Sequence, residues 1–240
     1  MHVDYEGPAD GRPLVLLHGG IGTGRYHWSK PLTALAEAGW RVHLPDLPGH
    51  GRTPVGDREY GRDVLVDAVR AHLESLEEPA VVGGFSMGGH TALALAQHDH
   101  DLFAGLVLVG VSVRDHEGLH GWRSKFEPDT LQEIYPLWVK QLARLHEPLG
   151  GPDAWRGVCT RDSSGLAVDV DLDALAGLEV PTLLVRGDTD VTVDPTHYAE
   201  LREIWPHAEE FVVPDGGHDV QLTRAEVVTP VLVDFLGRAV

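Results

Sequence analysis

The sequence predicts an α/β protein built on a doubly wound, mostly parallel sheet of about seven strands. Two observations lead to this fold class. Short apolar runs rich in Val and Leu recur along the chain, and near-continuous apolarity is typical of a parallel strand buried on both faces. Helical patterns separate most of these runs, and alternating strands and helices favour right-handed crossovers within one parallel sheet.

The predicted elements follow the chain in the order that such a sheet requires. Strands are expected at residues 14–17, 42–44, 80–82, 106–109, 182–185 and 211–213. Helices are expected at residues 28–38, 62–76, 87–97, 195–204 and 225–236. Because right-handed crossovers make the strands parallel, their carboxyl ends share one edge of the sheet, where such folds bind ligands.

One segment, residues 114–171, departs from this alternation and shows no strand pattern. It contains a helical run over 130–146, which Pro136 should kink or restart, followed by a Ser-, Gly- and Asp-rich return. An insertion of this length between two strands is too long for a loop. We therefore expect a helical lid at 114–171, called the lid segment below, on a core domain made of 1–113 and 172–240.

The composition is that of a globular protein with an acidic surface. The chain has 240 residues, 42% of them hydrophobic, and a formal net charge of −18 with no basic run to offset it. This charge repels phosphate backbones, which argues against nucleic acid as a partner. We expect a monomer or a homodimer that acts on a small-molecule substrate.

No targeting or membrane segment is visible in the sequence. The first residues lack a basic start followed by a long apolar stretch, and no apolar run approaches the length of a membrane span. The single cysteine, Cys159, excludes an internal disulfide, which fits a reducing compartment. We therefore expect a cytoplasmic protein with no membrane partner.

The stretch from Gly84 to Gly88, GFSMG, places Ser86 between a predicted strand and a predicted helix. This is the pattern G-x-S-x-G in the strand–turn–helix context that gives it meaning. The small residues let a tight turn close, so the serine projects above the sheet beside the start of the helix. Free N–H groups and the helix dipole stabilise negative charge there. Ser86 is thus a candidate nucleophile.

A serine hydroxyl needs a histidine to take its proton, and that histidine needs a carboxylate to fix its tautomer. Both residue types follow later strands of the predicted sheet. The strand at 182–185 runs into Asp188 and Asp190, and the strand at 211–213 runs into His218. Acid and base are therefore expected beside the serine at the carboxyl edge, with the choice between the two aspartates open at this point.

Five short motifs occur in a fixed order along the chain. They are the turn His18-Gly19-Gly20, the turn DLPGHGRT at 46–53, the turn around Ser86, the G-x-x-D pattern at 187–190, and Gly217-His218. By these motifs the chain resembles the α/β-hydrolase superfamily over nearly its whole length outside the lid segment. The resemblance implies the fold of that superfamily, with a small helical lid.

The resemblance also implies a role for each candidate residue. In that family the acid is the last residue of G-x-x-D, which is Asp190 here, so that Asp188 is left as a turn former. Ser86 would be the nucleophile and His218 the base that takes its proton. These three residues form the predicted catalytic set.

The same resemblance implies the donors of an oxyanion hole. One donor would be the backbone N–H of Met87, directly after the nucleophile. The second would be the backbone N–H of Gly20, in the turn after the first central strand, with Ile21 as the alternative.

Two features depart from the family pattern. Few residues precede the strand at 14–17, so the outermost edge strand should be missing and the sheet should have seven strands rather than eight. The proline that commonly follows G-x-x-D comes one position late, at Pro195, which bears on the local geometry at Asp190.

Two other motifs give rival interpretations, and both are weak. Residues 20–24, GIGTG, follow a strand as a dinucleotide-binding loop does, with Asp46 as the ribose acid, but residue 25 is Arg instead of the third glycine. Residues 116–120, HEGLH, match a zinc-protease helix, but Gly118 weakens the helix that two zinc ligands need. We therefore expect no cofactor and no metal.

The expected reaction is acyl transfer to water by a carboxylesterase-like serine hydrolase. Its substrate would be a small to medium, largely apolar ester, contacted by Ile21, Trp138 and Trp155. A carbon–carbon bond hydrolase, or a lyase of the menaquinone-pathway type, is the alternative with the same catalytic residues, although that lyase has an arginine where this chain has His90. A ligand-binding receptor on a hydrolase scaffold is the alternative of another class.

Overall fold

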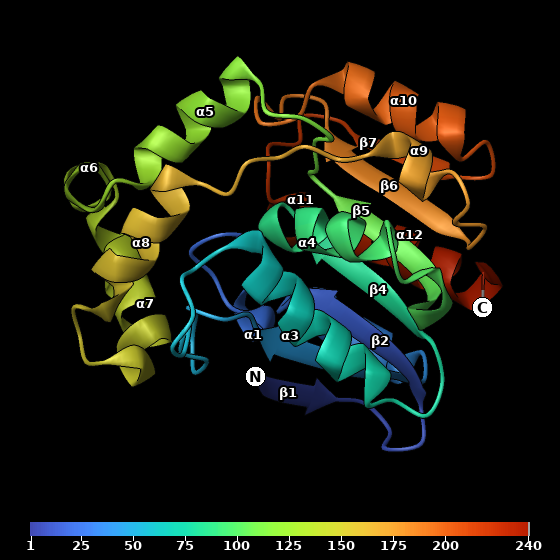
Figure 1. Ribbon diagram of the computed structural model, residues 1–240, viewed down its shortest axis with the longest axis horizontal. Helices are drawn as coiled ribbons and strands as arrows, with labels where there is room; N and C mark the ends of the chain where they lie inside the picture. The colour runs from blue at the N-terminus through green and yellow to red at the C-terminus, as the bar shows by residue number, and fades with distance from the viewer. Residues whose placement is uncertain (240) are drawn as a thin grey trace.

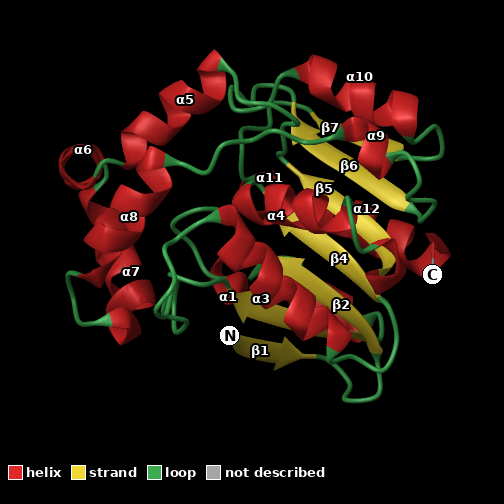
Figure 2. Ribbon diagram, in the orientation of Figure 1, coloured by secondary structure: helices red, strands yellow, loops and turns green. Residues whose placement is uncertain are grey.

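The computed structural model describes residues 1–239, which form a seven-stranded sheet with helices on both faces (Figures 1 and 2). The strands are β1 (His2–Glu6), β2 (Arg12–Leu17), β3 (Trp40–Asp46), β4 (Ala80–Phe85), β5 (Phe103–Val109), β6 (Thr182–Gly187) and β7 (Glu209–Val213). Their order across the sheet is β1-β3-β2-β4-β5-β6-β7. The predicted fold class and strand number are confirmed.

The antiparallel part of the sheet is its first edge. There β1 pairs antiparallel with β3, placing Asp4 opposite Leu44, and the other neighbouring strands run parallel. The segment before β2 thus supplies one antiparallel edge strand of the seven-stranded sheet.

The helices follow the predicted alternation. They are α1 (Gly24–His27), α2 (Leu32–Glu37), α3 (Arg62–Glu74), α4 (Met87–Ala96), α5 (Glu117–Arg123), α6 (Pro128–Ile134), α7 (Pro136–His146), α8 (Ala154–Ser164), α9 (Leu172–Leu175), α10 (Pro195–Ile204), α11 (Val220–Thr223) and α12 (Ala225–Ala239). Short 3₁₀ turns lie at His100–Leu102, Ser124–Phe126 and Glu147–Leu149. Among the described residues, no helix has the length and apolarity that a membrane crossing requires.

Both faces of the sheet are buried, because side chains alternate along each strand. Val15 and Leu17 pack on one face, against side chains of α3, α4 and α10. Leu14 and Leu16 pack on the other face, against side chains of α2 and α12. The continuous apolar runs of the sequence therefore reflect burial on two sides, as a parallel sheet requires.

Two predicted helices differ in detail from the observed ones. The run at 130–146 breaks at Tyr135, and α7 starts at Pro136, where a helix tolerates proline because the missing N–H has no intrahelical acceptor there. The helix predicted at 28–38 is reduced to α2. Trp28 lies before it, fully buried, with its indole N–H donated to the Leu17 carbonyl at 3.0 Å. Trp28 is therefore apolar because it packs in the core, and not because it begins a helix.

The lid segment lies between β5 and β6 and contains α5 to α8. Figure 1 shows these helices beside the carboxyl ends of the strands, set apart from the layers that cover the sheet. They enclose a hydrophobic core of their own, which also takes in one residue of the core domain. Its buried members are Ile21, Leu131, Val139, Leu142, Trp155, Val158 and Cys159.

The strand order determines which loops lie side by side at the carboxyl edge of the sheet. The chain passes from β2 to β3 on one side and returns to β4 on the other side of β2. The loops after β2 and β4 therefore leave the sheet side by side, at the kind of switch point where doubly wound folds bind ligands.

Candidate active site

Ser86 sits in a strained turn between β4 and α4. Its φ and ψ angles are 48° and −115°, a conformation that L-residues rarely adopt. Neighbouring glycines allow the turn, because a Cβ on Gly84 would lie 2.5 Å from Gly89 Cα and one on Gly88 would lie 2.6 Å from the His18 carbonyl oxygen. The turn is also tied to β5, since Ser86 N–H donates to the Val109 carbonyl at 2.9 Å.

The start of α4 favours negative charge beside this serine. Ser86 is the N-cap and Met87 is the first helical residue, so the Met87 N–H belongs to the turn that has no intrahelical acceptors. The positive end of the helix dipole lies at the same point.

His218 is paired with Asp190. The His218 Nδ1 lies 2.8 Å from Asp190 Oδ2, and the Asp190 carboxylate is buried. Asp188, by contrast, is an exposed residue whose Oδ1 accepts the Gly216 N–H at 3.2 Å. The geometry thus brings Asp190 and not Asp188 to the imidazole, and it leaves Nε2 of His218 for other partners.

Thr192 completes this arrangement and was missed by the sequence analysis. Its hydroxyl and N–H donate to Asp190 Oδ1 at 2.7 and 2.8 Å, and its Oγ1 also lies 2.7 Å from His218 Nδ1. Burial raises the pKa of Asp190, but His218 and the hydrogen bonds from His218 and Thr192 outweigh it and hold that pKa below its usual range. The Asp-x-Thr pattern, which recurs at the N-cap Asp194, was the available signal.

Aromatic side chains and one glycine position the imidazole. The ring of His218 packs against Phe85 and Trp122, with ring centroids 4.9 and 5.8 Å apart. Gly110, just after β5, has a φ of +60°, and a Cβ there would lie 3.0 Å from His218 Nδ1. A larger residue at this position would therefore crowd the imidazole.

The loop after β2 offers one amide near the serine. Gly19 N–H donates to His27 Nδ1 at 3.2 Å, and Ile21 N–H donates to the Asp162 carboxylate. Among residues 1–239, Gly20 N–H has no acceptor, which leaves it available to an oxyanion. Ile21 is therefore wrong as the alternative donor, because its N–H is already bound.

Ile21 itself has an uncommon conformation. Its φ is 50°, which is a genuine outlier for a β-branched residue. The residue is 1% exposed, lines the cavity described next, and packs in the hydrophobic core of the lid segment.

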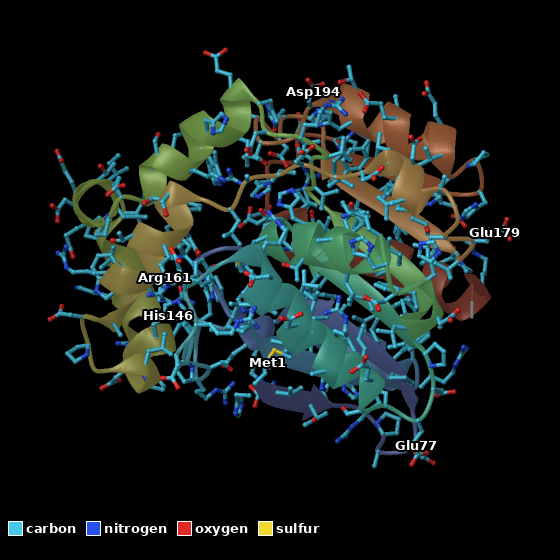
Figure 3. The ribbon with its side chains drawn as sticks, in the orientation of Figure 1. Met1, Glu77, His146, Arg161, Glu179 and Asp194 are labelled. Atoms are coloured by element: carbon cyan, nitrogen blue, oxygen red, sulfur yellow. The ribbon has the colours of Figure 1, made fainter. Side chains whose placement is uncertain are left out.

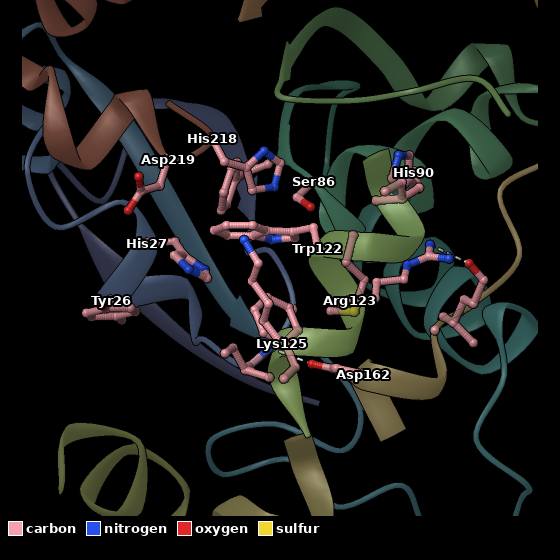
Figure 4. A pocket seen from close by; sticks show the side chains of 18 of the residues that line it. Tyr26, His27, Ser86, His90, Trp122, Arg123, Lys125, Asp162, His218 and Asp219 are labelled. Carbon is pink, nitrogen blue, oxygen red and sulfur yellow. Dashed lines mark hydrogen bonds between the residues drawn. The ribbon is translucent and has the colours of Figure 1, made fainter. Parts of the chain in front are cut away.

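A cavity of about 410 Å³ lies between the sheet edge and the lid segment. Figure 4 shows Ser86 and His218 together in its wall, with Trp122 beside them. Much of the lining is aromatic or aliphatic. The apolar lining residues include Phe85, Met87, Leu119, Trp122, Phe126, Tyr135, Trp138 and Leu166.

The two tryptophans predicted to touch substrate are placed differently. Trp138 lines the cavity. Trp155 does not, because it is 3% exposed in the lid core, where it packs with Val158 and Cys159 and carries the Arg156 guanidinium over its ring. Trp155 is thus a packing residue of the lid segment.

Basic groups in the lining were not predicted. Arg62 and Arg123 both reach the cavity and donate to the Leu166 carbonyl, in the loop after α8. Arg62 also donates to the Ala167 carbonyl, and Arg123 pairs with Asp115 at 3.0 Å. Burial lowers the pKa of Arg62, and burial followed by the charges of both arginines lowers the pKa of His90 well below its ordinary value. Figure 4 places His90 and Arg123 on one side of Ser86.

The residues behind the two rival motifs have other partners. Nε2 of His116 lies 2.9 Å from the Thr192 carbonyl oxygen, and His120 is exposed. In the part of the chain that the structure describes, no group of three or more His, Cys, Asp or Glu side chains is arranged to hold a metal ion. Asp46 is fully buried and accepts hydrogen bonds from the backbone and side chain of Arg52.

Comparisons with known proteins identify the family. A model of the Alpha/beta hydrolase family matches residues 14–230. The pimeloyl-[acyl-carrier protein] methyl ester esterase of Vibrio cholerae is similar, with 27% identity over 262 residues that cover 99% of each chain.

Two solved structures share the fold. The meta-cleavage product hydrolase of Pseudomonas fluorescens IP01 has a TM-score of 0.78 at 22% identity, covering 100% of this chain and 94% of that one. The enol-lactonase of Burkholderia xenovorans LB400 has a TM-score of 0.77 at 22% identity, covering 98% of this chain and 95% of that one. The family model and the named relative together support a hydrolase. The chain belongs to the alpha/beta hydrolase family.

Proposed function

We propose that this protein is a serine hydrolase that cleaves a carboxylic ester through an acyl-enzyme on Ser86. The observation that carries the proposal is the buried pair of Asp190 and His218, with 2.8 Å between Oδ2 and Nδ1, in the same cavity wall as a serine in a strained turn. A surface serine in a flexible loop would need none of these features.

The proposed reaction begins with attack of Ser86 Oγ on the ester carbonyl carbon. His218 takes the hydroxyl proton on Nε2, while Asp190 holds Nδ1–H and stabilises the imidazolium. The N–H groups of Gly20 and Met87 bind the oxyanion. The alcohol leaves with the proton from His218, and a water molecule activated by the same imidazole then releases the acid and restores the serine.

The cavity supports a small to medium substrate with a largely apolar body. Its volume of about 410 Å³ lies at the lower end of the usual range for ligand pockets. The aromatic lining from Trp122, Phe126 and Trp138 suits an acyl chain or an apolar alcohol. The similar esterase of Vibrio cholerae is named for a methyl ester, which also favours an ester substrate.

A second candidate is favoured by the basic wall of the cavity. Arg62 and Arg123 place guanidinium groups near His90, where the lyase of the menaquinone-pathway type has an arginine. A substrate that carries a carboxylate would find its partner there. A carbon–carbon bond hydrolase or such a lyase, acting through the same serine and histidine, is therefore the alternative.

The test compares Ser86→Ala and His218→Ala with the parent enzyme on nitrophenyl esters of increasing chain length. Each variant should lose at least about 10³-fold in kcat with unchanged thermal stability. Ser75→Ala, at the end of α3, is the matched control and should keep full activity. Substantial turnover by Ser86→Ala would refute the proposed mechanism.

The same series tests the observation that favours the second candidate. It should include matched esters that end in a methyl group or in a carboxylate. Higher kcat/KM for the neutral esters supports the carboxylesterase with a largely apolar substrate, whereas strong preference for the acidic esters would indicate that the basic wall of Arg62 and Arg123 binds a substrate carboxylate, as the alternative requires. Tight binding of ligands by a parent enzyme that turns over no ester would instead indicate a receptor.

A further inference from the structure

Two buried polar side chains of the lid segment hold the two successive peptides on either side of Ile21, in the loop after β2, called the oxyanion loop below. Asp162 in α8 accepts the N–H of Ile21, and Nε2 of His146 at the end of α7 lies 3.0 Å from the Ile21 carbonyl oxygen. Asp162 is 8% exposed and His146 is fully buried. Both backbone groups of Ile21 are therefore bound by residues more than a hundred positions away, in an inserted segment.

The hydrogen bonds of His146 fix its tautomer. Gly51 N–H donates to Nδ1 at 3.0 Å, so Nε2 carries the proton and donates it to the Ile21 carbonyl. Burial lowers the pKa of His146 to about 4, and the neutral imidazole that results is the form this geometry requires.

Asp162 is a buried carboxylate with several donors. It accepts from Nε2 of His50 at 3.0 Å and from the hydroxyl of Tyr60 at 3.2 Å, besides Ile21 N–H. Burial raises its pKa, but the charge of His50 and these hydrogen bonds outweigh it and hold that pKa below the usual range. An ionised group is kept inside a protein at considerable cost, so its retention points to a role beyond packing.

The contacts of Asp162 reach Gly20 directly. A Cβ built on Gly20 would lie 3.2 Å from Asp162 Oδ2, so the carboxylate rests against this residue. The Ile21 N–H and the Gly20 carbonyl belong to one planar peptide, whereas the Gly20 N–H belongs to the peptide before it. Holding the later peptide restrains the ψ angle of Gly20, one of the two torsions that set the direction of the Gly20 N–H relative to that peptide. The side chain of Ile21, packed in the lid core, holds the same strained backbone from a third direction.

We propose that Asp162 is a positioning residue for the oxyanion hole, which together with His146 holds the two peptides flanking Ile21 so that Gly20 N–H faces the oxyanion. The inference rests on the proposed function, because it deepens the role of the same site. It makes the lid segment part of the catalytic apparatus. The competing interpretation is that Asp162 only fastens the lid segment to the core.

A neighbouring residue separates these two interpretations. Arg161 also belongs to α8 and donates to the Gly49 carbonyl at 2.7 Å, a second link between lid and core that does not involve the oxyanion loop. Figure 3 marks Arg161 and His146 where the lid helices meet the core. Arg161→Met removes this link while keeping most of the side-chain volume, and it is the matched control.

The experiment measures steady-state kinetics and inhibition by a phenylboronic acid, which forms a tetrahedral adduct on a serine nucleophile. In Asp162→Asn, kcat should fall by about 10- to 100-fold with little change in KM, because a small displacement weakens only transition-state contacts. The boronate Ki should rise in parallel with the fall in kcat. His146→Gln should show a smaller effect of the same kind, and Arg161→Met should show neither.

Three results would overturn the inference. One is an Asp162→Asn enzyme with unchanged kcat and boronate Ki, whatever its melting temperature. Another is a fall in kcat at unchanged boronate Ki, and the third is an equal loss in Arg161→Met. If Asp162→Asn does not fold, His146→Gln decides by the same two measurements.

Failure of the proposed function gives a different pattern. In that case the boronate does not inhibit the parent enzyme, and Ser86→Ala retains turnover. An inhibited parent enzyme with an inactive Ser86→Ala variant, beside an unaffected Asp162→Asn, refutes only the positioning role.

Discussion

At the scale of single residues, two carboxylates two positions apart have different surroundings. Asp188 follows directly on β6, is exposed, and accepts one backbone N–H from Gly216. Asp190 lies further along the same turn, where Thr192 folds back on it and His218 closes over it. Charge alone could not distinguish the two, but burial and donors do.

This difference predicts unequal mutants. Asp190→Asn should lower kcat by roughly 10²- to 10⁴-fold, because the amide cannot stabilise the imidazolium and favours the wrong tautomer. Asp188→Asn should change kcat little, since its side chain does not reach the imidazole. Steady-state rates on one nitrophenyl ester check both variants, and equal losses would contradict this assignment of the acid.

The sequence predicted those side chains that are part of a local motif. Ser86 and His218 could be recognised because each follows an apolar strand at a characteristic turn. Thr192 also had a local signal, the Asp-x-Thr pattern, which was missed. Asp162 could not be recognised in the same way. The partners of Asp162 lie 102, 112 and 141 positions away, and no local pattern records such contacts.

At the scale of elements, the aromatic residues of the lid segment have two different structural roles, which could not be assigned from composition. They divide between an internal core and a cavity wall. Trp155 faces the core with Cys159, whereas Trp138 faces the cavity. Both lie in helices of the lid segment, so the sequence could not tell which way each points before the helices were packed together.

This division predicts distinct effects of truncation. Trp138→Ala should enlarge the cavity and shift the preferred ester toward longer chains. Trp155→Ala should remove about 3–5 kcal/mol of packing and lower the melting temperature by on the order of 10 °C, with the ranking of esters unchanged. A chain-length series and a thermal melt check the pair, and a shifted ranking in Trp155→Ala alone would contradict the placement.

At the scale of the whole molecule, the sheet order brings the reactive groups together. The loops after β2, β4, β6 and β7 all leave the same edge, because these strands are parallel. The parallel strands and their shared edge could be predicted from the apolar runs and their alternation with helices. The docking of α7 and α8 on the loop after β2 did not follow, because it depends on packing between segments distant in sequence.

Because of that docking, the reactivity of one buried thiol reports whether the core of the lid segment is closed. Cys159 is the single cysteine of the chain, and it is 1% exposed within the same small core that encloses Ile21. Burial, with Asp162 nearby, raises the pKa of its thiol to about 12, so at pH 8 almost no thiolate forms while the core stays closed. A disulfide reagent such as dithionitrobenzoate should therefore react far more slowly with the native enzyme than with the denatured chain, and faster with Asp162→Asn, as followed by absorbance. Equal rates in native and denatured protein would mean that this core opens freely. Slow labelling would instead measure how often the core opens, and each opening exposes the packing between Ile21 of the oxyanion loop and the lid helices.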